Sequence, residues 1–298
     1  MSQMGVQHLT TNTFENIPNI QCLNLARNNI SDIPEEVFHS KNFENLIYLN
    51  LSSNRLDVNE LDFINNHKNL KTLVLDSNTR NNDEICLSEN KDTKLRVLSL
   101  KNCYLYSLSS NCHYEQKNYP LKFLTALDLS HNEFNVSSLT YDRLPSLQNL
   151  SLSHNRLHSV PENLAEFPDL KVLSLSYCDI TKITSDTFKN FSRLEILSLR
   201  GNQITKIDFT LNLPNLRILD LAENQLHSLP INWSANLNNL RYLNLNSNYF
   251  PSMEALNLGS QLELKNLEDL HLRNNLISSI IVPLDLPSEL TIHVGPIL

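Results

Sequence analysis

The segment LEILSLRGNQI, from Leu194 to Ile204, carries leucine or isoleucine at its first, fourth, sixth and eleventh positions and asparagine at its ninth. A second segment of the same form, LRILDLAENQL, begins 22 residues later at Leu216. The pattern recurs eleven times, with starts that lie 22 to 29 residues apart. The starts are Ile20, Leu46, Leu70, Leu95, Leu124, Leu147, Leu170, Leu194, Leu216, Leu240 and Leu267. Eleven matches in register at this period indicate a repeat architecture.

The pattern LxxLxLxxNxL is typical of leucine-rich repeats and predicts an α/β solenoid. We expect a horseshoe of about eleven full repeats, with a parallel β-sheet on the concave face and irregular or 3₁₀ returns on the outside. The apolar positions should point inward and stack on those of the next coil. The asparagine at the ninth position should tie each turn to its neighbour, because a buried amide both donates and accepts hydrogen bonds. Cys103 and Cys178 hold that position in two coils and are predicted to be buried.

The repeats cover almost the whole chain, which we interpret as a single solenoid over residues 1–298. Residues 20–277 hold the eleven repeats, and residues 278–298 hold a terminal partial repeat with a final strand. The segment HLTTNTFENIPNI (8–20) aligns with KITSDTFKNFSRL (182–194). Residues 1–19 are therefore predicted to be the half coil of a preceding repeat.

Two longer stretches resemble one class of these proteins. IPEEVF (33–38) followed by NLIYLNLSSNRL (45–56), and ITSDTFKNFSRLEILSLRGNQI (183–204), are similar to the typical repeats of extracellular proteins such as Toll-like receptor and chaoptin-type ectodomains. The resemblance implies a surface or secreted receptor-like protein that binds a protein or microbial ligand or a co-receptor, with a homodimer as one arrangement. Proteins of this class usually carry cysteine-rich caps, which neither end has. We therefore expect a fragment that lacks its caps, the alternative being a complete protein with a frayed first coil.

The composition argues against several other functions. The formal net charge of −8 disfavours nucleic-acid binding, and no run of 18 apolar residues predicts direct membrane insertion. Only 4 residues are glycine, and the glycine-rich phosphate-binding motifs, HExxH and CxxC are absent from the sequence. We predict no enzyme activity, no cofactor and no metal site.

Five cysteines leave at least one without a partner in the chain. Cys86 and Cys112 follow the starts of neighbouring repeats by 16 and 17 residues, so they should lie close together on the outer side. Such a separation is compatible with a disulfide bond. The alternative is two free surface thiols in a reducing compartment.

A partner surface is predicted on the sheet, where positions three, five, seven and eight face outward from the core. The third positions of successive repeats form an apolar column, and polar or aromatic side chains surround it. The column comprises Val172, Ile196, Ile218 and Tyr242, and the surrounding residues are Tyr177, Arg200, Asp220, Glu223 and His271. Aromatic and arginine side chains on an apolar patch are favoured at interface centres. The alternative is that β-branched residues merely suit a strand.

His131 and His154 hold equivalent eighth positions in successive repeats. They could form a close pair that responds to pH or contributes to a metal site, although solvated surface residues are the simpler interpretation.

The leading hypothesis is a non-catalytic protein-binding module located outside the cell or on its surface. It would bind through the concave face or through the outer insertions at 79–92 and 104–120. The alternative is a cytoplasmic leucine-rich-repeat scaffold that wraps a partner protein. The absence of a signal peptide and the segment LHSVPENLAEFPDL (157–170), which resembles intracellular repeats, favour the alternative.

Overall fold

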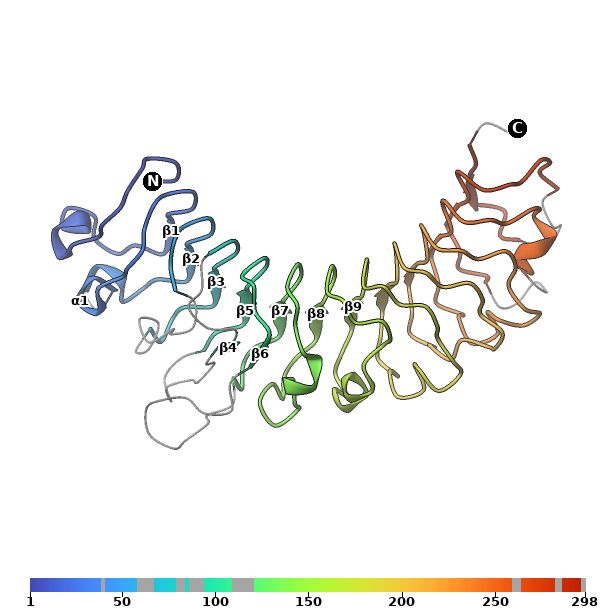
Figure 1. Ribbon diagram of the computed structural model, residues 1–298, viewed down its shortest axis with the longest axis horizontal. Helices are drawn as coiled ribbons and strands as arrows, with labels where there is room; N and C mark the ends of the chain where they lie inside the picture. Colours follow the sequence, from blue (N-terminus) through green and yellow to red (C-terminus); the bar gives the residue numbers. More distant parts are fainter. Residues whose placement is uncertain are drawn as a thin grey trace. The chain divides into compact units, whose positions relative to one another are not determined.

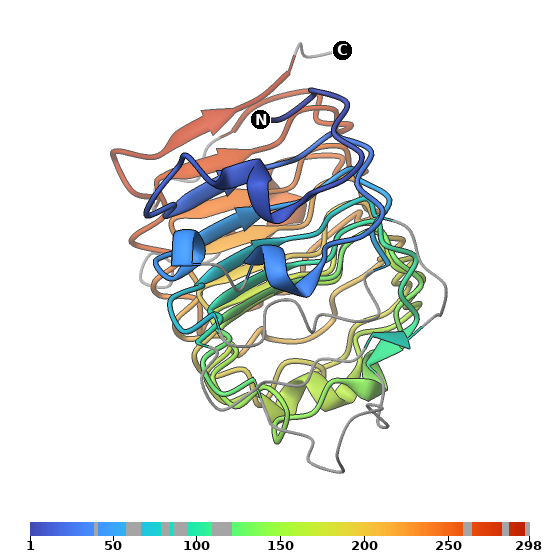
Figure 2. The same cartoon turned by 90° about the vertical axis from the view of Figure 1, so that its left-hand side faces the viewer.

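The computed structural model describes residues 1–38, 41–57, 67–78, 84–85, 94–108, 121–258, 264–281 and 286–295. The chain divides into two compact units, Met1–Leu150 and Ser151–Leu298. In each unit short parallel strands line one side of successive coils, and the returns line the other side (Figure 1, Figure 2). The predicted solenoid is therefore confirmed, whereas its extent as a single domain stays a prediction.

Each of the eleven motifs contributes one strand, formed by its third to fifth positions. In the first unit the strands are β1 (Cys22–Asn24), β2 (Tyr48–Asn50), β3 (Thr72–Val74), β5 (Val97–Ser99), β7 (Ala126–Asp128) and β8 (Asn149–Ser151), which ends at the unit boundary. In the second unit they are β9 (Val172–Ser174), β10 (Ile196–Ser198), β11 (Ile218–Asp220), β12 (Tyr242–Asn244) and β13 (Asp269–His271). The predicted final strand is β14 (Thr291–His293), which pairs with β13.

The core of each coil consists of the four apolar motif positions. In the coil that contains β10, Leu194, Leu197, Leu199 and Ile204 are each at most 1% exposed. Leu197 lies in register with the equivalent leucines of β9 and β11, so the same side chains stack from coil to coil. Burial of one such side chain stabilises the fold by about 1.5–3 kcal/mol.

The asparagine at the ninth position bridges adjacent coils, as predicted. Asn202 accepts hydrogen bonds at Oδ1 from the backbone N–H groups of Cys178 and Ile180, both at 3.0 Å. Its Nδ2 donates to the carbonyl oxygens of Leu175 and Leu199 at 2.9 and 2.8 Å. The amide thereby satisfies buried backbone groups on both coils, which would otherwise destabilise the turn.

The two cysteines in this column are buried, as predicted. The Cys178 thiol donates to the Leu152 carbonyl at 3.2 Å, and the Cys103 thiol donates to the Leu75 carbonyl at 3.3 Å. Burial raises the pKa of each thiol to about 11. Each cysteine therefore replaces the hydrogen-bond-donating amide nitrogen of asparagine with a neutral thiol that donates one hydrogen bond.

The eighth position of every motif has a left-handed backbone. The residues are Arg27, Ser53, Ser77, Asn102, His131, His154, Tyr177, Gly201, Glu223, Ser247 and Asn274, with φ between 54° and 67°. This conformation destabilises a residue other than glycine by roughly 1 kcal/mol. It is required here by the turn that leads away from each strand. The sequence pattern gave no sign of it, because Gly201 is the only glycine in the column.

The described parts of the returns include short helices and irregular segments. They include η1 (Thr11–Phe14), α1 (Glu35–Phe38), η2 (Lys41–Phe43), η4 (Val136–Ser138), η5 (Glu162–Glu166) and η6 (Glu254–Leu256). Aromatic side chains pack inside them: the ring centroid of Phe14 lies 5.1 Å from that of Phe43, and Phe188 is likewise buried. In the second unit, buried Trp233 donates from Nε1 to the Leu256 carbonyl at 3.0 Å.

Part of the predicted outer insertions is described. β4 (Glu84–Ile85) pairs in parallel with β6 (Ser107–Leu108), so the two returns meet on the outer side of neighbouring coils. Cys86 and Cys112 lie outside the described residues.

Candidate functional site

The predicted apolar column exists as a row of laterally paired residues on the solvent side of the sheet in the second unit. Val172 pairs with Ile196, Ile196 with Ile218, and Ile218 with Tyr242. All four side chains are half-buried. They form a continuous apolar strip across four strands.

A polar row runs beside this strip at the fifth motif position. Ser198 lies in register with Asp220, and Asp220 with Asn244. The Asp220 carboxylate accepts a hydrogen bond from the backbone N–H of Ala222 at 3.0 Å, and the Asn244 side chain accepts the equivalent bond from Asn246 at 3.1 Å. Burial raises the pKa of the Asp220 carboxyl group. Asp220 therefore helps to form the turn after its strand as well as lining the surface.

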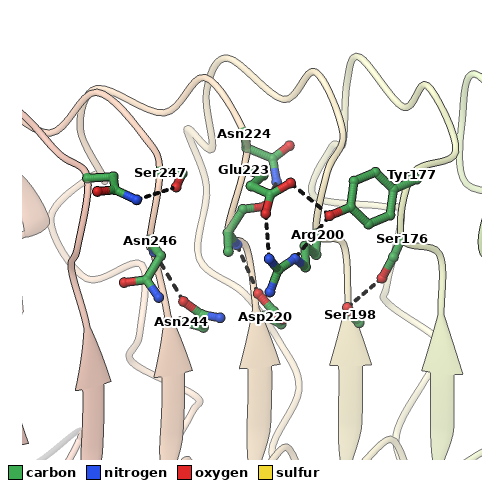
Figure 3. Close-up of polar contacts among 12 residues, drawn as sticks. Ser176, Tyr177, Ser198, Arg200, Asp220, Glu223, Asn224, Asn244, Asn246 and Ser247 are labelled. Atoms are coloured by element: carbon green, nitrogen blue, oxygen red, sulfur yellow. Dashed lines mark hydrogen bonds and ion pairs between the residues drawn. The ribbon is translucent and has the colours of Figure 1, made fainter. Parts of the chain in front are cut away.

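Tyr177, Arg200 and Glu223 come together from three successive coils (Figure 3). The Tyr177 hydroxyl donates to Glu223 Oε2 at 2.7 Å, and Arg200 Nε donates to the Tyr177 oxygen at 3.2 Å. Arg200 Nη2 forms an ion pair with Glu223 Oε1. We call these three residues the Tyr–Arg–Glu cluster.

The contacts within the cluster also shift its ionisation. The hydrogen bond from Tyr177 and then the ion pair with Arg200 lower the pKa of the Glu223 carboxyl group. The pKa of the Arg200 guanidinium is raised, chiefly by its hydrogen bond to Tyr177 and then by Glu223. Both charges are therefore retained at neutral pH, on side chains that are 42% and 38% exposed.

The backbone of the eighth motif position explains where the Tyr177 ring lies. Its left-handed turn directs the ring along the column, where it stacks on His154 with centroids 4.6 Å apart and an interplanar angle of 13°. On the other side it covers Gly201, where an added Cβ would overlap the ring carbons Cδ1 and Cε1. Gly201 is thus required by its close approach to Tyr177 as well as by its own positive φ. The sequence prediction included Tyr177 but missed the roles of Gly201 and His154.

His271 belongs to a different cluster at the far end of this sheet. Its ring stacks on that of His293 with centroids 4.1 Å apart, and it contacts the Tyr242 ring at 4.8 Å. His293 Nε2 lies 3.2 Å from Asp269 Oδ1. Burial and then the neighbouring His293 lower the pKa of His271. The sequence prediction named neither Asp269, which lies in the eleventh motif, nor His293, which lies on β14 outside the eleven motifs.

The predicted pairing of His131 with His154 remains a prediction. His131 belongs to the first unit and His154 to the second.

A polar depression of about 360 Å³ lies beside the beginnings of the strands in the second unit. It is lined by Lys171, Arg193, Glu195, Asn215, Arg217 and Asn239. Arg193 is paired with Asp169, and Arg217 Nη1 lies 3.6 Å from Glu195 Oε2. These are exposed ion pairs, which contribute little to stability.

Among the described residues, no helix is long and apolar enough to span a membrane.

Comparison with known proteins identifies the repeats independently. A family model described as "Leucine Rich repeats (2 copies)" matches residues 145–190 and 192–232. A second model, "Leucine Rich repeat", matches residues 16–33 and 121–139.

Several solved structures are similar over most of the chain. The leucine-rich repeat domain of APL1B is 26% identical with a TM-score of 0.58, and the match covers 91% of this chain and 80% of that chain. An internalin (inlF) from Listeria monocytogenes str. 4b F2365 is 22% identical with a TM-score of 0.56, and the match covers 97% of this chain and 85% of that chain. This similarity shows that the two chains share a fold. A chain of the LRIM1/APL1C complex is 26% identical with a TM-score of 0.63, and the match covers 92% of this chain but 47% of that chain.

Proposed function

Because the chain is a leucine-rich-repeat protein, we propose that it is a non-catalytic recognition module that binds a protein partner through the sheet of its second unit. Leucine-rich-repeat domains are typically protein-interaction modules without enzyme activity. The partner would be a protein ligand, a co-receptor or a second copy of the chain. One structural neighbour is itself a complex of two leucine-rich-repeat chains.

The observation that carries this proposal is the Tyr–Arg–Glu cluster beside the apolar strip. Tyrosine and arginine are over-represented among residues that dominate binding energy, and they act best near apolar surface that becomes dry on binding. The internal bonds of the cluster hold Tyr177 and Arg200 in place before a partner arrives, which reduces the entropy lost on binding.

We further propose that the module belongs to a surface or secreted receptor-like protein of the Toll-like or chaoptin type. The support is the resemblance of segments 33–38, 45–56 and 183–204 to the typical extracellular repeat. The compartment is tested by alkylating the native protein without reduction and searching its digest by mass spectrometry for a peptide that joins Cys86 to Cys112. Such a peptide is expected for a protein that matured in an oxidising compartment. Two freely alkylated thiols would contradict an extracellular location.

A cytoplasmic scaffold is the second candidate, and a structural observation favours it in addition to the two sequence features given above. Cys22 is an exposed free thiol, and exposed thiols persist most readily in a reducing compartment. In that case the same sheet surface would wrap an intracellular protein.

The partner surface is tested by site-specific photocrosslinking. A photoreactive phenylalanine derivative replaces Tyr242 on the sheet in one variant and Ile231 in another. Ile231 is the matched control because it is apolar and 76% exposed, yet lies on the return of the preceding coil. We expect a partner from the native source to be captured from position 242 and not from position 231.

The captured partner is then purified and its affinity measured for Ile218→Asp and for Ile231→Asp. A charge in the middle of the apolar strip should weaken binding by about tenfold or more, which corresponds to at least about 1.4 kcal/mol. The control should bind as the unaltered chain does, and circular dichroism establishes that both variants are folded. Equal affinity of the two variants, or equal capture from both positions, would refute a binding surface on the sheet.

A further inference from the structure

Three side chains at the last strand pair of the second unit present metal-binding atoms to one another. Asp269, His271 and His293 each offer one ligand atom, and all three atoms lie within 4.8 Å of one another. Each side chain is partly exposed on the solvent side of the sheet. The group lies outside the Tyr–Arg–Glu cluster, although His271 is among the residues predicted to surround the apolar strip.

The register of the sheet fixes this arrangement. Asp269 and His271 are the first and last residues of β13, so they point to the same face because side chains alternate along a strand. His293 on β14 lies directly opposite His271, one strand spacing away. No backbone movement is needed to bring the three groups together.

The distances suit a small ion of intermediate softness. In a tetrahedral site with bonds of about 2.0–2.1 Å, ligand atoms lie roughly 3.3 Å apart. The 3.2 Å between His293 Nε2 and Asp269 Oδ1 already meets this requirement. The ligand atom of His271 lies within 4.8 Å of both, so its side chain would have to rotate to bind the same ion. Two imidazoles and a carboxylate favour zinc, cobalt, nickel or copper, whereas calcium and magnesium prefer sites made of oxygen ligands alone.

We propose that Asp269, His271 and His293 form a binding site for one divalent transition-metal ion. Three protein ligands leave a fourth position open, as in zinc sites that bind water or an incoming ligand. That position faces solvent on the same side of the sheet as Tyr242, whose ring contacts His271. The proposal goes beyond partner recognition and does not depend on it.

The test uses the full chain without a polyhistidine tag, freed of metal with a chelator. Zinc chloride is titrated by isothermal calorimetry at about pH 7.5, where imidazole ligands are largely neutral. Cobalt(II) is added in parallel, and its visible absorption reports on coordination geometry. We expect one ion per chain and cobalt bands typical of nitrogen and oxygen ligands in a tetrahedral site.

Three variants identify the ligands: Asp269→Asn, His271→Ala and His293→Ala. Each should weaken zinc binding by at least about tenfold, the lower end of what even supporting residues of metal sites contribute. His227→Ala is the matched control, because His227 is exposed and packs on an aromatic ring but is remote from the three ligands in the sequence. Trp233 fluorescence verifies that every variant is folded.

Absence of zinc binding by the unaltered chain would overturn the proposal. So would any one of the three variants that binds zinc as tightly as His227→Ala does, because the site would then not need that ligand. Near-ultraviolet charge-transfer bands of cobalt thiolate would also overturn it, since they would place the ion on cysteine.

Discussion

Replacing Asn202 with alanine should destabilise the second unit by about 4 kcal/mol. The substitution removes four hydrogen bonds of 2.8 to 3.0 Å, two accepted from Cys178 and Ile180 and two donated to Leu175 and Leu199. Each such bond contributes a net of about 1 kcal/mol. Of the four groups left behind, the Leu199 carbonyl still accepts a hydrogen bond from Asn224 Nδ2 at 2.9 Å. The loss exceeds that of an ordinary surface substitution because one side chain serves two coils.

The measurement is equilibrium unfolding in urea followed by the fluorescence of Trp233, the only tryptophan in the chain. Trp233 is fully buried in the second unit, so its emission reports on the unit that contains Asn202. Gln203→Ala is the matched control, since the adjacent side chain is exposed, and it should change the free energy of unfolding by at most about 0.5 kcal/mol. Asn202→Cys should fall between the two, because Cys178 shows that a thiol keeps one donor in this column.

A loss below about 1 kcal/mol for Asn202→Ala would refute this reasoning, because it would mean that the four bonds are replaced on substitution. Equal losses for Asn202→Ala and Asn202→Cys would refute the narrower claim that the thiol preserves the donor half of the asparagine.

Three further predictions concern the column of eighth positions and the thiols. Gly201→Ala should lower the melting temperature more than Gly5→Ala, because both glycines have φ of 67° but only Gly201 lies under the Tyr177 ring; equal effects would exclude the ring contact as a cause. Glu223→Gln should be less stable than the unaltered chain at neutral pH, and the difference should shrink as the pH falls below about 4.5. The pKa of Glu223 is lower in the folded state than in the unfolded state. The ionised carboxylate therefore stabilises the fold above the unfolded-state pKa, and this stabilisation is lost as the pH falls through the folded-state pKa. A stability difference between the two proteins that stays constant over this pH range in urea unfolding would contradict the prediction. In the native protein at about pH 8, Cys22 should react with a thiol reagent, because it is exposed. Cys103 and Cys178 should not react, because burial raises the pKa of each thiol to about 11. Peptide mapping identifies the labelled cysteines, and labelling of Cys178 in the folded protein would contradict the prediction.

The sequence predicted those features that repeat along the chain. Positions of leucine and asparagine defined the strands, the buried ladder around Asn202 and the lateral row from Val172 to Tyr242, because each depends on equivalent residues in adjacent coils. The same logic placed Cys103 and Cys178 in the core.

Features that depend on one particular pair of neighbours were missed. The stacking of Tyr177 between His154 and Gly201 requires the left-handed turn, which the motif does not reveal because its eighth position varies in residue type. The proximity of His271 to His293 depends on the register of β14, which lies outside the eleven motifs. Neither contact follows from the repeated positions of the motif.

The left-handed column has a consequence for anyone who wishes to engineer this array. Ser53 and Ser77 occupy it in the first unit without belonging to the proposed surface, so asparagine or glycine could be introduced there to relieve backbone strain. Tyr177 and Glu223 occupy the same column at the proposed surface. Asparagine or glycine in their place would relieve the same backbone strain but would remove the side chains that a partner would contact. Thermostability and recognition are therefore separable in the first unit but opposed in the second.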